Sequence, residues 1–201
     1  RIVANPSQIT VLDYVDNKDR YQNLIDQGLN YEFGEVTQEN LSELLSKYVG
    51  DGDLLLDLAW NIDANAIIGW AHDHDVLYLN TSVEEWDPYG DAKKRNPLDR
   101  TLYVRHMRLR EMKSKWTKTG ATSIVEHGAN PGLVSHLVKK ALVDIANKTI
   151  EDGIATDAIK SALAAEDYAK LAQALTVKVI HISERDTQVS DKPKLLNEFV
   201  N

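Results

Sequence analysis

The sequence predicts an α/β fold built on a parallel sheet. Short apolar or β-branched runs alternate along the chain with amphipathic helical patterns, and the segments that join them are short and polar. One run, Leu54–Trp60, is nearly continuously apolar, as expected of a central parallel strand that is covered on both faces. With 201 residues, 43% of them hydrophobic, the chain can form one domain and part of a second.

The first half contains four strand-like runs with a helical pattern after each of the first three. The strands are expected at Ile9–Asp13, Tyr31–Val36, Leu54–Trp60 and Val76–Leu79. The helices are expected at 18–27, at 38–49 after Thr37 as N-cap, and at 63–74. Four parallel strands with short crossovers make a doubly wound sheet of the Rossmann type.

The second half begins with an irregular segment, 83–97, which we interpret as a functional loop. A basic helix at 98–116, a strand at 121–126 and a helix at 133–147 are expected to complete the sheet domain over 1–150. Residues 151–201 then begin a second, α+β catalytic domain. The expected elements there are an Ala-rich helix at 154–175 and a strand at 176–182.

Composition narrows the function classes. The chain contains no Cys and no long apolar segment, so we expect a cytoplasmic protein without disulfides or membrane association. The net charge of −8 disfavours a dedicated nucleic-acid binder, although residues 93–118 are strongly basic. That basic helix lacks a recognition motif. His72, His74 and Asp75 lack an evident third ligand, so no metal is predicted.

Asp13 ends the first strand, where a carboxylate can bind both ribose hydroxyls of an adenosine and so favour NAD over NADP. A solvated Asp at a strand end is the alternative. The glycine-rich loop G-x-G-x-x-G that should precede such a strand does not occur in these 201 residues. We therefore expect the first strand and its loop to lie upstream, and this stretch alone to bind the dinucleotide weakly.

Polar groups follow the next strands at the same expected edge of the sheet. Asn80–Trp86 places amide, hydroxyl, carboxylate and indole groups just past a central strand, and carboxylates and Trp faces both bind ammonium groups. A loop with a buried anchoring Trp is the alternative. Asn61 can contact the adenine side of a dinucleotide, whereas Asp63 is expected to cap a helix.

Gly128-Ala129-Asn130-Pro131-Gly132 lies between a strand and a helix. Asn130 can hold a nicotinamide carboxamide or orient a substrate beside the helix N-terminus. Because Asn, Pro and Gly all form turns, a plain turn is the alternative.

These motifs, in this order, resemble bacterial-type homospermidine synthase, of the saccharopine-dehydrogenase-like group. The resemblance rests on Asn80–Trp86, Gly128–Ser135, Val177–Gln188 and Lys192-Pro193-Lys194. It implies tightly held NAD and an aminoalkyl transfer in which two putrescines give homospermidine and ammonia through bound imines. It also implies a homodimer. Two alternatives stay open: a saccharopine- or carboxyspermidine-type NAD(P)H dehydrogenase, and a non-catalytic Rossmann module.

The resemblance also implies residue roles. Glu84 and Glu184 are expected to bind the diamine and handle protons, with Trp86 beside them, and Asn130 completes the predicted catalytic set. Asn61 matches a position where the family can carry Asp. The cofactor side is expected to comprise Asp13, Asn61, Asn80, Thr81, Ala129 and Asn130. The glycine loop and the family's later Trp and acidic residues are absent here, so we expect the 201 residues alone to be inactive.

Overall fold

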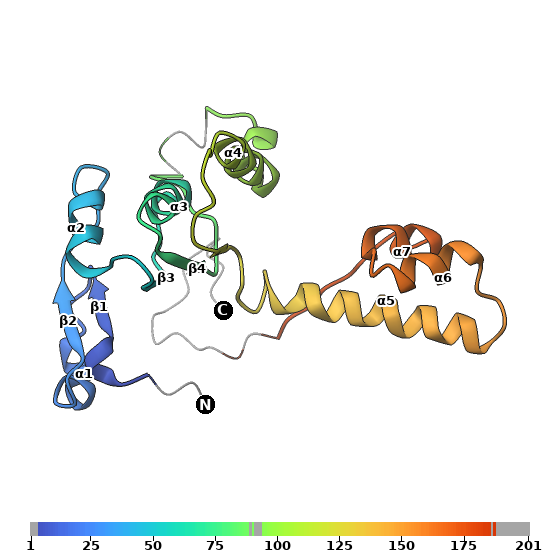
Figure 1. Cartoon of the computed structure of the whole chain (residues 1–201), viewed down its shortest axis with the longest axis horizontal. Coiled ribbons are helices and arrows are strands. Elements are labelled where there is room, and N and C mark those ends of the chain that lie inside the picture. The colour runs from blue at the N-terminus through green and yellow to red at the C-terminus, as the bar shows by residue number, and fades with distance from the viewer. Residues whose placement is uncertain (1–3, 89, 91–93, 186, 188–201) are drawn as a thin grey trace, which may run out of the picture. The chain divides into compact units, whose positions relative to one another are not determined.

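The computed structural model describes residues 4–88, 90, 94–185 and 187. The chain forms two compact units, Arg1–Gly132 and Leu133–Asn201, which are described separately below (Figure 1).

Unit 1 is an α/β domain whose strand pairs are all parallel. β1 (Thr10–Asp13) pairs with β2 (Asn30–Phe33). β3 (Leu54–Asp57), β4 (Leu77–Asn80) and β5 (Ser123–Ile124) form a sheet in the order β3-β4-β5. The predicted α/β class is therefore confirmed. Parallel pairing also sets the carboxyl ends of β3, β4 and β5 at one edge of their sheet, and this edge carries the candidate site.

The helices of unit 1 follow the predicted order with shorter bounds. They are α1 (Lys18–Ile25), α2 (Leu41–Tyr48), α3 (Ala64–Asp73) and α4 (Leu102–Ser114), with 3-10 turns at Pro6–Gln8 and Pro97–Arg100. Thr37 and Asn40 exchange hydrogen bonds, since Asn40 N donates to Thr37 Oγ1 and Thr37 N donates to Asn40 Oδ1. The regular helix then begins only at Leu41, one turn later than predicted.

Helix α3 is at the centre of the unit 1 core. Its apolar residues pack with α2, β4 and the loop after β4 in one cluster, and partly buried residues of α4 join it. Ala64, Ile68 and Ala71 are essentially inaccessible to solvent. Asp63 Oδ1 accepts a hydrogen bond from Ala66 N at 2.9 Å, which confirms Asp63 as the predicted N-cap. The cap fixes the start of α3 at the end of the turn that follows β3.

The sheet of unit 1 is in two parts, which the sequence did not predict. Among the described residues β1 does not pair with β3, and Figure 1 shows β2, β1, β3 and β4 in that order across the unit. Leu54, Leu56 and Leu58 are 60%, 53% and 65% exposed, so the prediction that this strand is covered on both faces is wrong here. Residues two apart share a face of a strand, and no described residue covers that face of β3.

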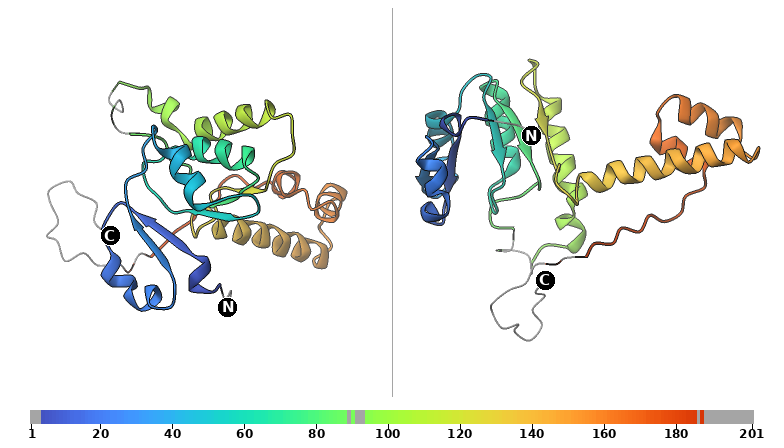
Figure 2. Two further views of the ribbon diagram at one scale, coloured as in Figure 1. Left: turned by 60° about the vertical axis from the view of Figure 1, so that its left-hand side comes forward. Right: turned by 90° about the horizontal axis from the view of Figure 1, so that it is seen from below.

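Unit 2 is helical in its described part: α5 (Leu133–Glu151), α6 (Asp157–Ala164) and α7 (Tyr168–Ala174) (Figure 2). Residues 154–175 are largely helical, as predicted, but they form two helices because the chain turns at Glu166, whose φ is +52°. Asp167 then caps α7 by accepting a hydrogen bond from Lys170 N. The buried cluster of unit 2 contains Leu142 and Ala146 of α5 with Ile159, Ala162 and Leu171.

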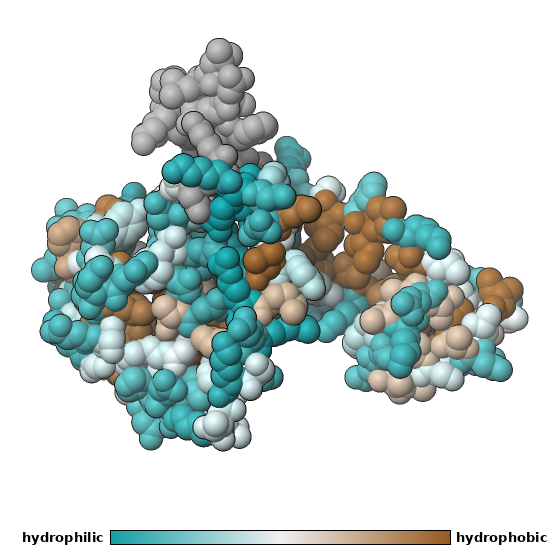
Figure 3. Space-filling model, turned by 90° about the horizontal axis from the view of Figure 1, so that it is seen from above, coloured by the Kyte–Doolittle hydropathy of each residue, from teal (hydrophilic) through white to brown (hydrophobic). Residues whose placement is uncertain are grey.

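The strand predicted at 176–182 does not form, because no described segment pairs with it. Its apolar residues Val179, Ile180 and Ile182 stay about half exposed or more. Helix α5 likewise presents Leu133, Leu137, Ile145 and Ile150 to solvent, and apolar residues gather at the surface along it (Figure 3). Across the described ranges no helix is both long and apolar enough to span a bilayer.

Candidate functional site

Three turns meet at the carboxyl edge of the β3-β4-β5 sheet. Ala64 N, at the start of α3, donates to Glu84 O at 3.2 Å and joins the turn after β3 to the turn after β4. His127 N donates to Asn80 O at 2.9 Å and joins the turn after β5 to the end of β4. Gly128 also lies close to Thr81, since a Cβ added at Gly128 would be 3.3 Å from Thr81 Cβ. These contacts bring most of the predicted site residues to one edge.

A buried chain of hydrogen bonds runs beneath this edge from β3 to the turn after β5. Tyr78 OH donates to Asp57 Oδ2 at 2.6 Å, and Asn80 Nδ2 donates to Tyr78 OH at 2.9 Å. Asn80 Oδ1 accepts from Glu126 N at 2.8 Å. Tyr78 and Asn80 lie two residues apart on β4 and are 1% and 0% exposed. The side chains of Asp57, Tyr78 and Asn80 therefore satisfy one another in this chain, as burial requires.

Burial changes the acidity of both ionisable groups in this chain. Removal from water raises the pKa of the Asp57 carboxyl, although the hydrogen bond from Tyr78 acts against that rise. Burial, followed by the nearby charge of Asp57, raises the pKa of the Tyr78 hydroxyl above its ordinary value. Tyr78 is therefore a neutral hydrogen-bond donor at physiological pH.

Asn80, which was predicted to contact the cofactor, has two protein partners for its side chain in the structure. Its amide nitrogen and oxygen are both engaged, and the residue is fully buried. Asn80 thus holds the turns after β4 and β5 in place. Thr81, the next residue, lies against Gly128 at the same edge.

Asn61 has the features of a ligand contact. It follows β3, its φ is +63°, and its Oδ1 is buried without a hydrogen-bond partner in the described structure. Left-handed backbone is tolerated best by Gly and Asn among L residues. A buried acceptor without a partner costs about 1–3 kcal/mol, a cost that a ligand donor would remove. The role of Asn61 beside a nucleotide stays a prediction.

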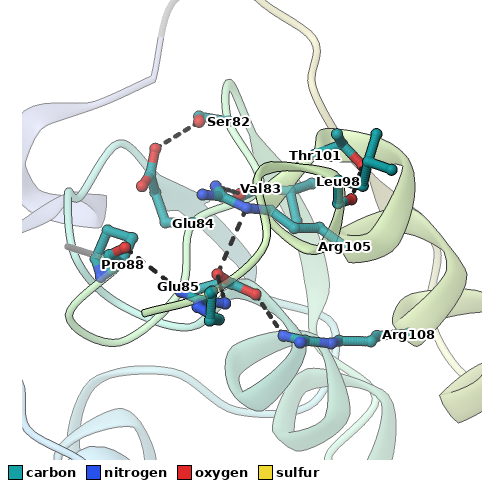
Figure 4. Close-up of polar contacts among 10 residues, drawn as sticks. Ser82, Val83, Glu84, Glu85, Pro88, Leu98, Thr101, Arg105 and Arg108 are labelled. Carbon is teal, nitrogen blue, oxygen red and sulfur yellow. Dashed lines mark hydrogen bonds and ion pairs between the residues drawn. The ribbon is translucent and has the colours of Figure 1, made fainter. Parts of the chain in front are cut away.

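Adjacent acids Glu84 and Glu85 have different surroundings (Figure 4). Glu84 Oε1 accepts from Ser82 Oγ at 2.6 Å. The Glu85 carboxylate instead faces guanidinium groups from Arg95, Arg105 and Arg108. Arg105 also donates to Val83 O at 2.6 Å, which fixes α4 to the loop that carries both acids. Among the described residues, these arginines pair with Glu85 and not with Glu84. Glu84 is thus the acid of this pair that can contact a ligand.

An open cavity of about 500 Å³ lies beside Glu85 and Trp86. The side chains that line it are Asp63, Glu85, Trp86, Asp87, Arg95 and Arg108. Trp86 therefore lines this cavity and also packs against the apolar core, as an anchoring Trp does. The predicted functional role and the alternative structural role of Trp86 are compatible.

The turn after β5 is closed by its two glycines. Gly128 N donates to Pro131 O at 2.9 Å, and Gly132 has a φ of +122°. A Cβ on Gly132 would be 2.4 Å from Gly128 O, so only Gly fits there. Ala129 and Asn130 lie exposed at the tip of this turn, at the same edge as Thr81.

Two predicted site residues lie elsewhere. Asp13 ends β1, in the two-stranded part of the sheet, where it accepts hydrogen bonds from Val15 N and Asn17 Nδ2. The bond from Val15, with that from Asn17, holds the pKa of Asp13 below its ordinary value, so this carboxylate stays charged. Glu184 belongs to unit 2, where it is exposed, and its place in the diamine pocket stays a prediction.

Four residues at or beside this edge were not predicted from the sequence: Asp57, Tyr78, His106 and Glu126. Glu126 has a φ of +55°, and its carboxylate is 2.7 Å from His106 Nε2 of α4. The sequence does carry a signal for this network: one strand ends in an Asp, and the next strand has a Tyr and an Asn two residues apart on one face.

His72 and His74, whose grouping superficially suggested a metal, stack on Trp116 and Trp70, respectively. Among the described residues no group of three or more metal-ligand side chains occurs.

Comparison with known proteins identifies the family. Residues 2–124 match the model of the saccharopine dehydrogenase NADP binding domain, and the chain belongs to this family. That match confirms the predicted Rossmann-type fold, and the family's description makes a nicotinamide dinucleotide its ligand class.

Particular relatives support the predicted resemblance. The chain is 36% identical to homospermidine synthase of Mesorhizobium japonicum and 32% identical to that of Blastochloris viridis, over 97% and 93% of this chain. It spans 39% of the length of each. The crystal structure of homospermidine synthase from Legionella pneumophila in complex with NAD matches 95% of this chain and 37% of its own, with a TM-score of 0.69 and 30% identity.

Asn80 provides a stability test of the buried chain. Asn80→Ala removes the donor to Tyr78 OH and leaves Glu126 N without its acceptor, so we expect a loss of about 2–4 kcal/mol in the free energy of unfolding. Urea unfolding followed by circular dichroism measures this. Asn23→Ala, on exposed α1, is the matched control and should change stability by less than about 0.5 kcal/mol. Equal effects of the two substitutions would contradict the role of Asn80.

Asp57 provides a pH test with a definite sign. Its raised pKa means that the folded state favours the protonated carboxyl, so this contribution to stability is present at acid pH and lost as the pH rises past 3.8. Asp57→Asn should therefore gain stability relative to wild type between about pH 4 and pH 7. Urea midpoints across this range measure the difference.

Asp13→Asn is the opposite control for that experiment. Because the pKa of Asp13 is lowered, its contribution is present above 3.8 and lost as the pH falls. Asp13→Asn should therefore lose stability relative to wild type as the pH rises. The same sign for both variants would refute the assignment of Asp57.

Proposed function

We propose that this chain supplies the dinucleotide-binding domain and part of the diamine site of a homospermidine synthase, which converts two putrescines to homospermidine and ammonia. The single observation that carries the proposal is the junction of the turns after β3, β4 and β5, which sets Asn61, Glu84 and the Asn130 turn at one sheet edge. The identities to two homospermidine synthases support it.

The residues at this edge fit the two ends of a nicotinamide dinucleotide. Asn61 offers an unpartnered buried oxygen, and the turn with Ala129 and Asn130 offers an exposed amide. Asp13 offers a carboxylate at the end of β1, where ribose hydroxyls bind in this fold. When bound, NAD would take a hydride from the amine-bearing carbon of one diamine and return it to the new imine.

Glu84 is proposed to bind the ammonium group and to move its protons. The amine must lose a proton before it is oxidised, and the second amine must lose one as it attacks the imine. Glu84 lies within hydrogen-bond reach of Ser82 Oγ, which orients one carboxylate oxygen. Glu184 is proposed as the second carboxylate of the same pocket. Trp86 would cover the alkyl chain and exclude water from the imine.

The rival dehydrogenase is not favoured by the surroundings of the arginines. A substrate carboxylate would need a free guanidinium group, but Arg95, Arg105 and Arg108 each lie against Glu85. A cytoplasmic homodimer, as implied by the family resemblance, stays a prediction for the product of the complete gene.

Glu84→Gln tests the proposed chemistry. The amide keeps the shape and the contact with Ser82 but cannot accept a proton, so we expect homospermidine formation to fall about 10²-fold or more. The assay follows homospermidine by mass spectrometry with putrescine and substoichiometric NAD, using the product of the complete gene. Glu43→Gln, on the exposed face of α2, is the matched control and should keep full activity.

Cofactor use separates the rivals in the same assay. The synthase makes product without net consumption of the dinucleotide, whereas a saccharopine- or carboxyspermidine-type dehydrogenase consumes one NAD(P)H for each product. No polyamine product from the wild-type protein would favour the non-catalytic module.

The 201-residue chain by itself is expected to form no homospermidine. Its sequence holds no G-x-G-x-x-G turn to bind a pyrophosphate through backbone N–H groups. Calorimetric titration with NAD should give binding at least about tenfold weaker than for the product of the complete gene. Turnover by the 201-residue chain would refute this expectation.

A further inference from the structure

The Glu85 carboxylate occupies a site made of guanidinium groups. Its Oε2 lies 3.6 Å from Arg95 Nη1 and 3.7 Å from Arg105 Nε, and its Oε1 contacts Arg108 Nη1. The Glu85 side chain is only 12% exposed, whereas that of Arg108 is 51% exposed. Figure 4 shows the carboxylate turned toward Arg105 and Arg108 and away from the Ser82 side of the loop.

The arginines are placed by the fold and not by Glu85 alone. Arg105 and Arg108 are three residues apart on α4 and so share one face of that helix. Arg105 is also held by its bond to Val83 O, and Arg95 Nη2 donates to Pro88 O at 3.4 Å. If the Glu85 charge were removed, guanidinium groups would remain beside the cavity.

Such a group of guanidiniums is suited to a carboxylate. The planar guanidinium fork matches carboxylate geometry, and charge-assisted hydrogen bonds of this kind are stronger than neutral ones. Arg95, Arg108, Glu85 and Trp86 line the same cavity. If an amine that carries a carboxylate entered this cavity, the guanidinium groups suited to bind its carboxylate would already be paired with Glu85.

We propose that Glu85 determines substrate specificity by acting as an internal carboxylate. It neutralises the arginines beside the cavity, so the pocket accepts an alkyl diamine and rejects a diamine that bears an α-carboxylate. This inference rests on the proposed function and deepens it. Specificity of this kind arises because the substrate with a carboxylate cannot pair with the arginines, whereas the contacts of the diamine are unchanged.

The experiment compares putrescine with ornithine, which is putrescine carrying an α-carboxylate. Binding of each to the product of the complete gene is measured by calorimetry, in wild type and in Glu85→Gln. The amide keeps the side-chain shape and releases the arginines, so the ratio of ornithine to putrescine affinity should rise about tenfold or more. Adding Arg108→Gln to Glu85→Gln should reverse most of that rise.

Two further variants keep the test decisive. Glu85→Asp retains the charge but withdraws it by one methylene, so the ratio should rise in the same direction by a smaller factor even if Glu85→Gln does not fold. Glu111→Gln is the matched control. Glu111 lies on α4, the helix that carries Arg105 and Arg108, and forms an exposed ion pair with Lys115 at 2.8 Å. Its ratio should equal that of wild type.

The proposal is overturned if folded Glu85→Gln or Glu85→Asp binds both ligands in the wild-type ratio. Glu85 would then be only a structural clamp between the loop and α4. Because the readout is binding, it stays separate from the test of turnover: a protein that makes no homospermidine would disprove the proposed function but still yield the ratio.

Discussion

The site depends on the buried hydrogen-bond chain that joins Asp57, Tyr78, Asn80 and the backbone of Glu126. Parallel strands bring their carboxyl ends to one edge, but they do not fix the turns that follow. Here Asn80 does so, because an amide has one donor group and one acceptor group and uses each toward a different neighbour. Since the chain is buried, each broken link would leave a polar group without a partner.

The electrostatic surroundings of two adjacent acids then give them different roles. Glu84 and Glu85 are neighbours in sequence, yet one is oriented by a hydroxyl and the other faces arginines. Attraction between Glu85 and three cations also ties α4 to the loop after β4, so the loop conformation and the charge of the cavity have a common origin. A basic helix in an acidic protein is explained in part by this internal contact.

The order and type of most elements could be predicted because they follow from local patterns. The alternation of apolar runs and amphipathic helices identified β1 to β5 and α1 to α5, with ends misplaced by a few residues. The failures occurred where partners decide the outcome. Residues 176–182 have the composition of a strand but no described segment to pair with, and Leu54, Leu56 and Leu58 have the composition of a covered strand face but no described cover.

By itself the sequence determined the α/β class, the family and the positions of Glu84 and Asn130 beside strand ends, because these depend on residue order and on hydropathy period. Only the tertiary structure decided which side chains are engaged and with what. Asn80 became a buried link, Asn61 kept an unpartnered oxygen, and Glu85 acquired three arginines, since each outcome depends on contacts between residues that lie 10 to 46 positions apart or on burial. Such contacts arise from packing, which local sequence does not encode.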